Sequence, residues 1–194
     1  YHCLDEHDGF VVYDRTSIQK SIDLMRRVAP SLVFTHPRND YMMDHEESSR
    51  LARAASFIYG APNASELPIL EGTCVPYLYY VDTPEGIDTL GNPLVPTTLI
   101  DISAQLEKKT EMLAAHASQR EWLRAHHGTD EYLDAMRRRA AALGQTMGVA
   151  AAWRAGIIAA STPNNNPTPT AVRMPYPGKK NFNSNPLKTS AFTR

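Results

Sequence analysis

The chain has 194 residues, with 20 basic and 21 acidic side chains and a formal net charge of −1. This length is sufficient for one domain with a sizeable core. The balanced charge argues against a nucleic-acid partner, because binding to phosphates generally requires a concentrated basic surface. No apolar run approaches the roughly 20 residues of a membrane-spanning helix, so we expect no membrane partner either.

Two cysteines, Cys3 and Cys74, are too few for a disulfide framework. We therefore expect reduced thiols and, by default, a cytoplasmic location. The chain starts at Tyr1 and shows no charged start followed by an apolar signal segment. We expect it to be a processed product or a fragment that lacks its true beginning.

The first half of the chain alternates between strand and helix patterns. A β-prone run at residues 10–13 precedes a helical pattern at 14–28, whose Arg26 and Arg27 we expect on a solvated face. A second short strand follows at residues 32–35, and a second helix begins at Asp44. This β-α-β-α order predicts an α/β fold with a parallel sheet.

The second half begins with a strand and ends in helices. We expect strands at residues 75–81 and 97–100, a long helix to about residue 126, and another at 130–143 with Gly144 as its C-cap. Beyond this the sequence becomes rich in Pro, Asn, Ser and Thr. We therefore predict a domain at residues 1–154 and a disordered, low-complexity tail at 155–194.

The loop between the second strand and the second helix contains the most promising chemical groups. Residues 34–45 read FTHPRNDYMMDH, so His36 follows the strand and His45 lies at the start of the helix. In open α/β folds, ligands bind beyond the carboxyl ends of the strands. The simpler alternative is that Asp44 caps the helix and His45 lies on its first turn. A catalytic zinc ion needs three protein ligands, and spacing alone supplies no partner for His45.

The sequence DYMMDH at residues 40–45 resembles the DYHPDH signature of the LmbE-like, or PIG-L-type, zinc-dependent de-N-acetylases. Further segments resemble this family in the same order, so the resemblance extends over residues 10–154. They are YLYYVD at 77–82, DIS at 101–103 with Lys109, HASQ at 116–119, and the closing segment at 148–154.

This resemblance implies a Rossmann-like three-layer α/β sandwich with a mostly parallel sheet, from which an N-terminal strand and helix are missing. It implies that His45 is a zinc ligand, that Asp44 is catalytic, and that His36, Asp40 and Tyr41 bind substrate. The implied activity is zinc-dependent removal of an N-acyl group from a small molecule, such as an N-acetylglucosamine conjugate. A homo-oligomer is also compatible with it.

Two departures weaken this expectation for the isolated chain. Met42 stands where many family members have a histidine that stabilises an oxyanion, and a thioether donates no hydrogen bond. The family's first signature, His-Pro-Asp-Asp, is absent from residues 1–194. We therefore expect weak zinc binding at most, since one histidine does not make a site. The alternative function is a non-catalytic sugar- or protein-binding member of the same fold.

Overall fold

The computed structural model describes residues 1–83, 86–94, 98–127, 131–158 and 170–172. The chain forms two compact units, which are described separately. Unit 1 comprises Tyr1–Val95 and Ala155–Asn166, and unit 2 comprises Pro96–Arg154 and Pro167–Arg194. None of the helices in the described ranges combines the length and the apolar character that a membrane crossing requires.

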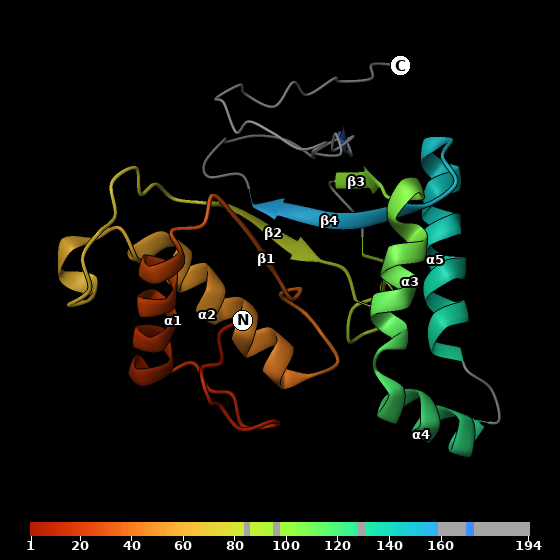
Figure 1. The fold of residues 1–194 in the computed structure, drawn as a ribbon, viewed down its shortest axis with the longest axis horizontal. Coiled ribbons are helices and arrows are strands. Elements are labelled where there is room, and N and C mark those ends of the chain that lie inside the picture. Colours follow the sequence, from red (N-terminus) through yellow and green to blue (C-terminus); the bar gives the residue numbers. More distant parts are fainter. Residues whose placement is uncertain (84–85, 95–97, 128–130, 159–169, 173–194) are drawn as a thin grey trace. The chain divides into compact units, whose positions relative to one another are not determined.

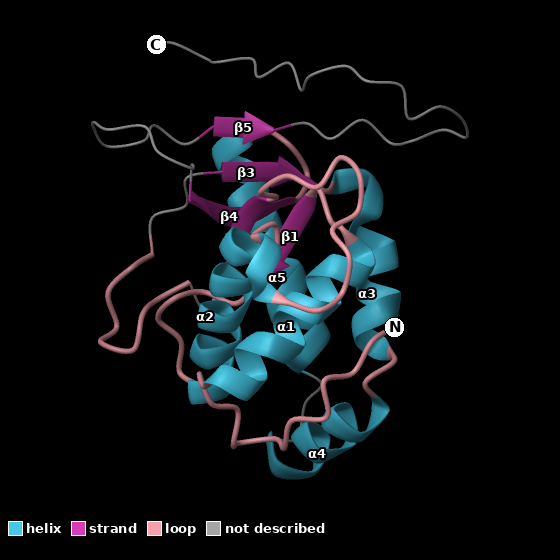
Figure 2. Ribbon diagram, turned by 90° about the vertical axis from the view of Figure 1, so that its left-hand side faces the viewer, coloured by secondary structure: helices cyan, strands magenta, loops and turns pink. Residues whose placement is uncertain are grey.

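Unit 1 contains a small mixed sheet with two helices (Figure 1). Strand β1 pairs in parallel with β2, with Leu32 opposite Tyr77, and β2 pairs antiparallel with the end of β4. Figure 2 shows helices α1 and α2 on one side of these strands. The elements of unit 1 are α1 (Arg15–Val28), β1 (Leu32–Thr35), α2 (Met43–Ile58), a 3₁₀ turn (Pro62–Ala64), β2 (Tyr77–Val81) and the end of β4 (Ala152–Ile158).

Helix α1 confirms the helical pattern predicted for residues 14–28. Asp14 is its N-cap and accepts a hydrogen bond from the Ser17 N–H at 2.8 Å. The helix ends at Ala29, which adopts a left-handed conformation with φ of 45°. The buried stripe of the helix carries Ile22 and Met25, which form the core of unit 1 together with Ala55 and Tyr59 of the α2 segment.

Arg26 corrects the prediction of a solvated face at the end of α1. Its side chain is buried, with 4% of its surface exposed, and its guanidinium donates to the carbonyls of Tyr59, Ala61, Ser65 and Leu67. An arginine is buried at low cost only where its donors are satisfied, and here four backbone acceptors satisfy them. The neighbouring Arg27 is exposed, as predicted.

The strand predicted at residues 10–13 does not form. Phe10 is 77% exposed, and this segment has no strand partner in the part of unit 1 that the structure describes. The Val11 N–H instead donates to Asp44 Oδ1 at 3.1 Å. A β-prone sequence forms a strand only when a neighbouring strand supplies its hydrogen-bond partners, and tertiary context overrides the local preference here.

Unit 2 contains helices and a parallel strand pair. Strand β3 pairs in parallel with β5, with Leu99 opposite Ala171. The long helix predicted to reach residue 126 is divided at Ala115 and His116. The elements of unit 2 are β3 (Thr98–Asp101), a 3₁₀ turn (Ser103–Gln105), α3 (Leu106–Ala114), α4 (Ala117–His127), α5 (Glu131–Met147) and β5 (Thr170–Val172), with the beginning of β4.

Gly144 lies inside α5 and is not its C-cap. The helix continues to Met147, and Gly148 takes the positive φ, of 69°, after its end. A Cβ atom at Gly144 would lie 2.6 Å from the Val149 carbonyl oxygen and 2.8 Å from the Ala151 nitrogen. The glycine is therefore required because the chain returns against the last turn of the helix.

The architecture is mixed α/β, since β1–β2 and β3–β5 are parallel and β2–β4 is antiparallel. Strand β4 continues to Ile158, beyond the domain end predicted at residue 154. Of the predicted tail, residues 159–169 and 173–194 lie outside the described residues. The division into a domain and a tail stays a prediction.

Candidate metal centre

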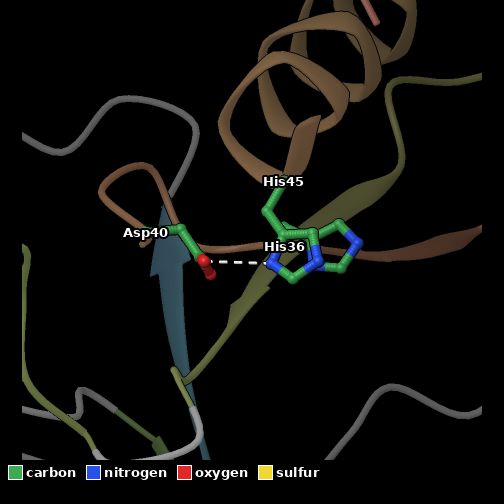
Figure 3. A group of neighbouring side chains, drawn as sticks. All are labelled: His36, Asp40 and His45. Atoms are coloured by element: carbon green, nitrogen blue, oxygen red, sulfur yellow. Dashed lines mark hydrogen bonds and ion pairs between the residues drawn. The ribbon is translucent and has the colours of Figure 1, made fainter. Parts of the chain in front are cut away.

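Three side chains that can bind a metal converge where β1 ends and α2 begins (Figure 3). His36 follows the last residue of β1, Asp40 lies in the connecting loop, and His45 lies in the first turn of α2. Each offers one ligand atom, and these atoms all lie within 4.8 Å of one another. Two imidazoles and one carboxylate form a ligand set that suits zinc and related divalent metals.

Asp40 organises this group from a buried position. It is 4% exposed, and its Oδ1 accepts hydrogen bonds from the Met42 N–H at 3.1 Å and from His45 Nδ1 at 2.9 Å. The Asp40 N–H donates to Glu46 Oε1 at 2.9 Å. A carboxylate bonded to a ring nitrogen fixes the orientation of a histidine.

His36 lies against the His45 ring. The two ring centroids are 4.0 Å apart and the planes differ by 6°. Burial lowers the pKa of His36, the adjacent His45 lowers it further, and Asp40 raises it in part. All these effects act on a half-buried imidazole, and their net direction favours the neutral form, which is the form that binds metals.

The structure therefore brings together His45, predicted as a metal ligand, with His36 and Asp40, predicted as substrate-binding residues. The sequence supplied no partner for His45, whereas the structure places His36 and Asp40 beside it. Tyr41, also predicted to bind substrate, packs edge-on against His45 with ring centroids 5.6 Å apart and is 67% exposed. It lies at the solvent side of the group.

Asp44, predicted as catalytic, is not a member of this three-residue group. Its carboxylate accepts the backbone N–H groups of Gly9 and Val11 and so fixes the segment that precedes α1. The catalytic role of Asp44 stays a prediction, and its observed contacts are those of a residue that anchors the chain.

The sequence contains a signal for this cluster that spacing arguments along one helix do not reveal. His36, Asp40 and His45 occur within ten residues of a strand–loop–helix connection. A loop that turns back on itself brings such residues together even when their spacing does not match one face of a helix. The signal was the concentration of ligand types in one loop after a strand.

A second loop is attached to this one. Thr89 Oγ1 donates to Asn39 Oδ1 at 2.8 Å, so the segment after β2 is tied to the loop that carries Asp40. Asp88 stabilises this segment by accepting from the Leu90 and Asn92 N–H groups, at 2.9 and 2.8 Å. Both loops belong to unit 1.

Comparisons with known proteins relate this chain to two solved structures. No model of a protein family matches the sequence, and no curated protein matches it significantly. One solved structure is GalB, the 4-carboxy-2-hydroxymuconate hydratase from Pseudomonas putida, with a TM-score of 0.59 and 22% identity. Another is the conserved protein TT1542 from Thermus thermophilus, with a TM-score of 0.66 and 24% identity.

These matches extend over most of this chain but not over most of the other proteins. They cover 80% of this chain and 63% of GalB, and 83% of this chain and 66% of TT1542. The chain thus spans somewhat less than two thirds of the length of either neighbour. At this level of identity the matches establish a shared fold.

The predicted membership of the LmbE-like family and the predicted de-N-acetylase activity are corrected by these findings. No family model supports the assignment, and one solved structure with a similar fold, GalB, is a hydratase. The resemblance rested on DYMMDH and on other short segments within residues 10–154, and such segments are compatible with more than one chemistry. The coarser expectations of a possible metal site and of similarity to an enzyme remain.

Proposed function

We propose that this chain carries the metal site of a hydratase, an enzyme that adds water to a carbon–carbon double bond of a small carboxylated substrate. The observation that carries this proposal is the convergence of His36, Asp40 and His45 at the end of β1. The similarity of the fold to that of a hydratase supports it. We further propose that the sheet belongs to a Rossmann-like three-layer arrangement, in which such a loop lies on the ligand-binding side.

Zinc is the metal we propose. With three protein groups as ligands, the site would keep an open coordination position, as catalytic zinc sites do. A zinc ion there would lower the pKa of a bound water and polarise an oxygen of the substrate. The hydrogen bond between Asp40 and His45 Nδ1 holds the His45 ring in a fixed orientation.

The surrounding side chains suit a carboxylated substrate. Arg38 lies two residues after His36, and its side chain is exposed. We propose that Arg38 binds a substrate carboxylate and that the exposed ring of Tyr41 packs against the conjugated part of the substrate. Hydration then breaks the π bond of the alkene and one O–H bond of water, and it forms a C–O bond to one alkene carbon and a C–H bond to the other.

This proposal is tested by an activity assay of the full chain loaded with zinc. The substrates are 4-carboxy-2-hydroxymuconate and simpler conjugated dicarboxylates. The assay follows loss of the conjugated absorbance and incorporation of ¹⁸O from labelled water into the product. We expect incorporation by the wild-type chain and its loss in His36→Ala and His45→Ala. The matched control is His126→Ala, since His126 is an exposed histidine of α4 that bonds to the Trp122 carbonyl.

The proposed hydratase activity would be refuted if the chain binds zinc through His36 and His45 but transfers no labelled oxygen to any of these substrates. Incorporation that persists in His45→Ala would refute the role of the site. The two results are distinct, because the first leaves the metal centre in place and the second removes it from the mechanism.

A further inference from the structure

A cavity of 690 Å³ lies along the C-terminal half of α2, at the opposite end of this helix from His45. Its volume is within the range of small-molecule sites, about 300–1,000 Å³. Its apolar wall includes Phe57 and Val75, which are 77% and 57% exposed, and the buried Leu78 of β2. All lining residues belong to unit 1.

The cavity has one cation without a counter-charge. Arg50 lines it, but its guanidinium pairs with Glu47 Oε1 at 2.7 Å and lies 4.5 Å from the centroid of the Tyr13 ring. Arg53 also lines the cavity and makes no ion pair with any residue in the described ranges. The lining contains no aspartate or glutamate. A single positive charge is therefore available to a ligand.

A buried hydroxyl provides a second polar group. Ser56 is 3% exposed and lines the cavity, and its Oγ has no hydrogen-bond partner among the described residues. Buried hydroxyl groups nearly always have a partner, and an unmet one is costly. A ligand oxygen in the cavity would satisfy it.

This cavity is separate from the metal centre. Residues 45 and 56 are 11 positions apart on one helix, which corresponds to about 16 Å along its axis. None of His36, Asp40 and His45 lines the cavity. A ligand of this size that fills the cavity would thus not be bound to the metal.

We propose that this cavity is a binding site for an amphiphilic monocarboxylate. The carboxylate accepts from Arg53 and from Ser56 Oγ, since charge-assisted hydrogen bonds are the stronger kind. The alkyl or aryl body packs on Phe57, Val75 and Leu78. Arg50 is paired with Glu47, so the charge of Arg53 fits one carboxylate, and the apolar side chains of the wall fit a body of several carbons.

Octanoate is the probe, titrated into the full chain by calorimetry and by NMR, with and without zinc. We expect 1-octanol, which has the same chain length without the charge, to bind at least tenfold more weakly. We expect Arg53→Gln to weaken octanoate binding at least tenfold and Ser56→Ala to weaken it severalfold. Arg27→Gln is the matched control, because Arg27 is an exposed arginine of α1.

Binding in His45→Ala should equal that of the wild type, which separates this cavity from the metal. Circular dichroism of each variant establishes that the fold is retained. The proposal is overturned if octanol binds as tightly as octanoate, if Arg53→Gln leaves the affinity unchanged, or if octanoate shifts the resonances of His36 and His45 in place of those of α2 residues 53–58. Absence of binding at millimolar octanoate also overturns it.

Discussion

A buried carboxylate determines what His45 is able to do. Asp40 is almost completely enclosed and bonds to His45 Nδ1 and to the Met42 N–H, so its position is fixed from two sides. The bond to Nδ1 keeps the imidazole of His45 beside this carboxylate. The rotamer of this ligand is thereby selected before any metal binds, which lowers the entropic cost of binding.

His36 makes the stability of the fold depend on pH. The folded state lowers its pKa below the ordinary value of 6.5, so the unfolded chain binds the proton more readily. Stability should therefore fall as pH drops through 6.5, and level off once the pH lies below the folded pKa. We expect His36→Gln to reduce this dependence.

The pH dependence of stability is measured by urea unfolding of the metal-free protein at pH 8, 7, 6 and 5. The difference between wild type and His36→Gln removes the contribution of the other histidines. A wild-type chain that gains stability relative to the variant at low pH would contradict the inferred direction.

At the scale of elements, Arg26 joins α1 to the chain that follows α2. One guanidinium bonds to four carbonyls between residues 59 and 67, and so holds an otherwise irregular segment on the helix pair. Replacing it removes these donors and leaves acceptors that are only partly reached by water.

We expect Arg26→Leu to destabilise unit 1 by at least about 2 kcal/mol, from the cost of unpaired buried acceptors. Arg27→Leu, at the adjacent exposed position, should change the free energy of unfolding by less than about 0.5 kcal/mol. Chemical denaturation of the two variants measures both. If both substitutions changed the free energy of unfolding equally, the buried hydrogen bonds of Arg26 would not contribute to stability.

In unit 2, Gly144 allows α5 to contact the chain that follows it. A methyl group there would lie 2.6–2.9 Å from three backbone atoms of residues 149–151, which cannot rotate away. We expect Gly144→Ala to cost about 1–3 kcal/mol through overpacking, although alanine has the higher helix propensity. A stabilised variant, by thermal unfolding, would show that α5 does not contact the following chain in this way.

Elements with strong local signals were predictable, and those that depend on distant partners were not. The helical pattern at residues 14–28 identified α1 within one residue. The run at residues 10–13 has a similar β-propensity to real strands, but the Val11 N–H bonds to Asp44 and not to a strand. Strand β4 was missed, because its pairing with β2 links residues more than 70 positions apart.

At the candidate site, too, local features were predictable and features that depend on the path of the chain were not. His45 was predicted as a ligand from the resemblance of residues 40–45 to a family signature, which is a local feature of the sequence. His36 and Asp40 were not predicted as ligands, because their closeness to His45 arises from the path of the loop. Likewise, Arg26 has the sequence context of a solvated arginine, and only the carbonyls of a later segment make it a buried one.

For the whole molecule, the fold and the chemistry are determined by different parts of the chain. Matches over 80% and 83% of its residues establish the fold, while three residues at the connection from β1 to α2 form the candidate metal site. Proteins with one fold have many different activities, so the function is inferred from the residues of the site. The short segments within residues 10–154 that suggested a de-N-acetylase did not determine the activity.

The measurement that tests the metal centre most directly is the zinc content and zinc affinity of the full chain. It is made by mass spectrometry and by competition with a chromophoric chelator, for wild type, His36→Ala, His45→Ala and the His126→Ala control. We predict one zinc ion per wild-type chain and per control, and at least tenfold weaker binding in either site variant, because each loses a ligand. Zinc binding that is absent from the wild type, or that is equally tight in all four proteins, would contradict a metal centre at His36, Asp40 and His45.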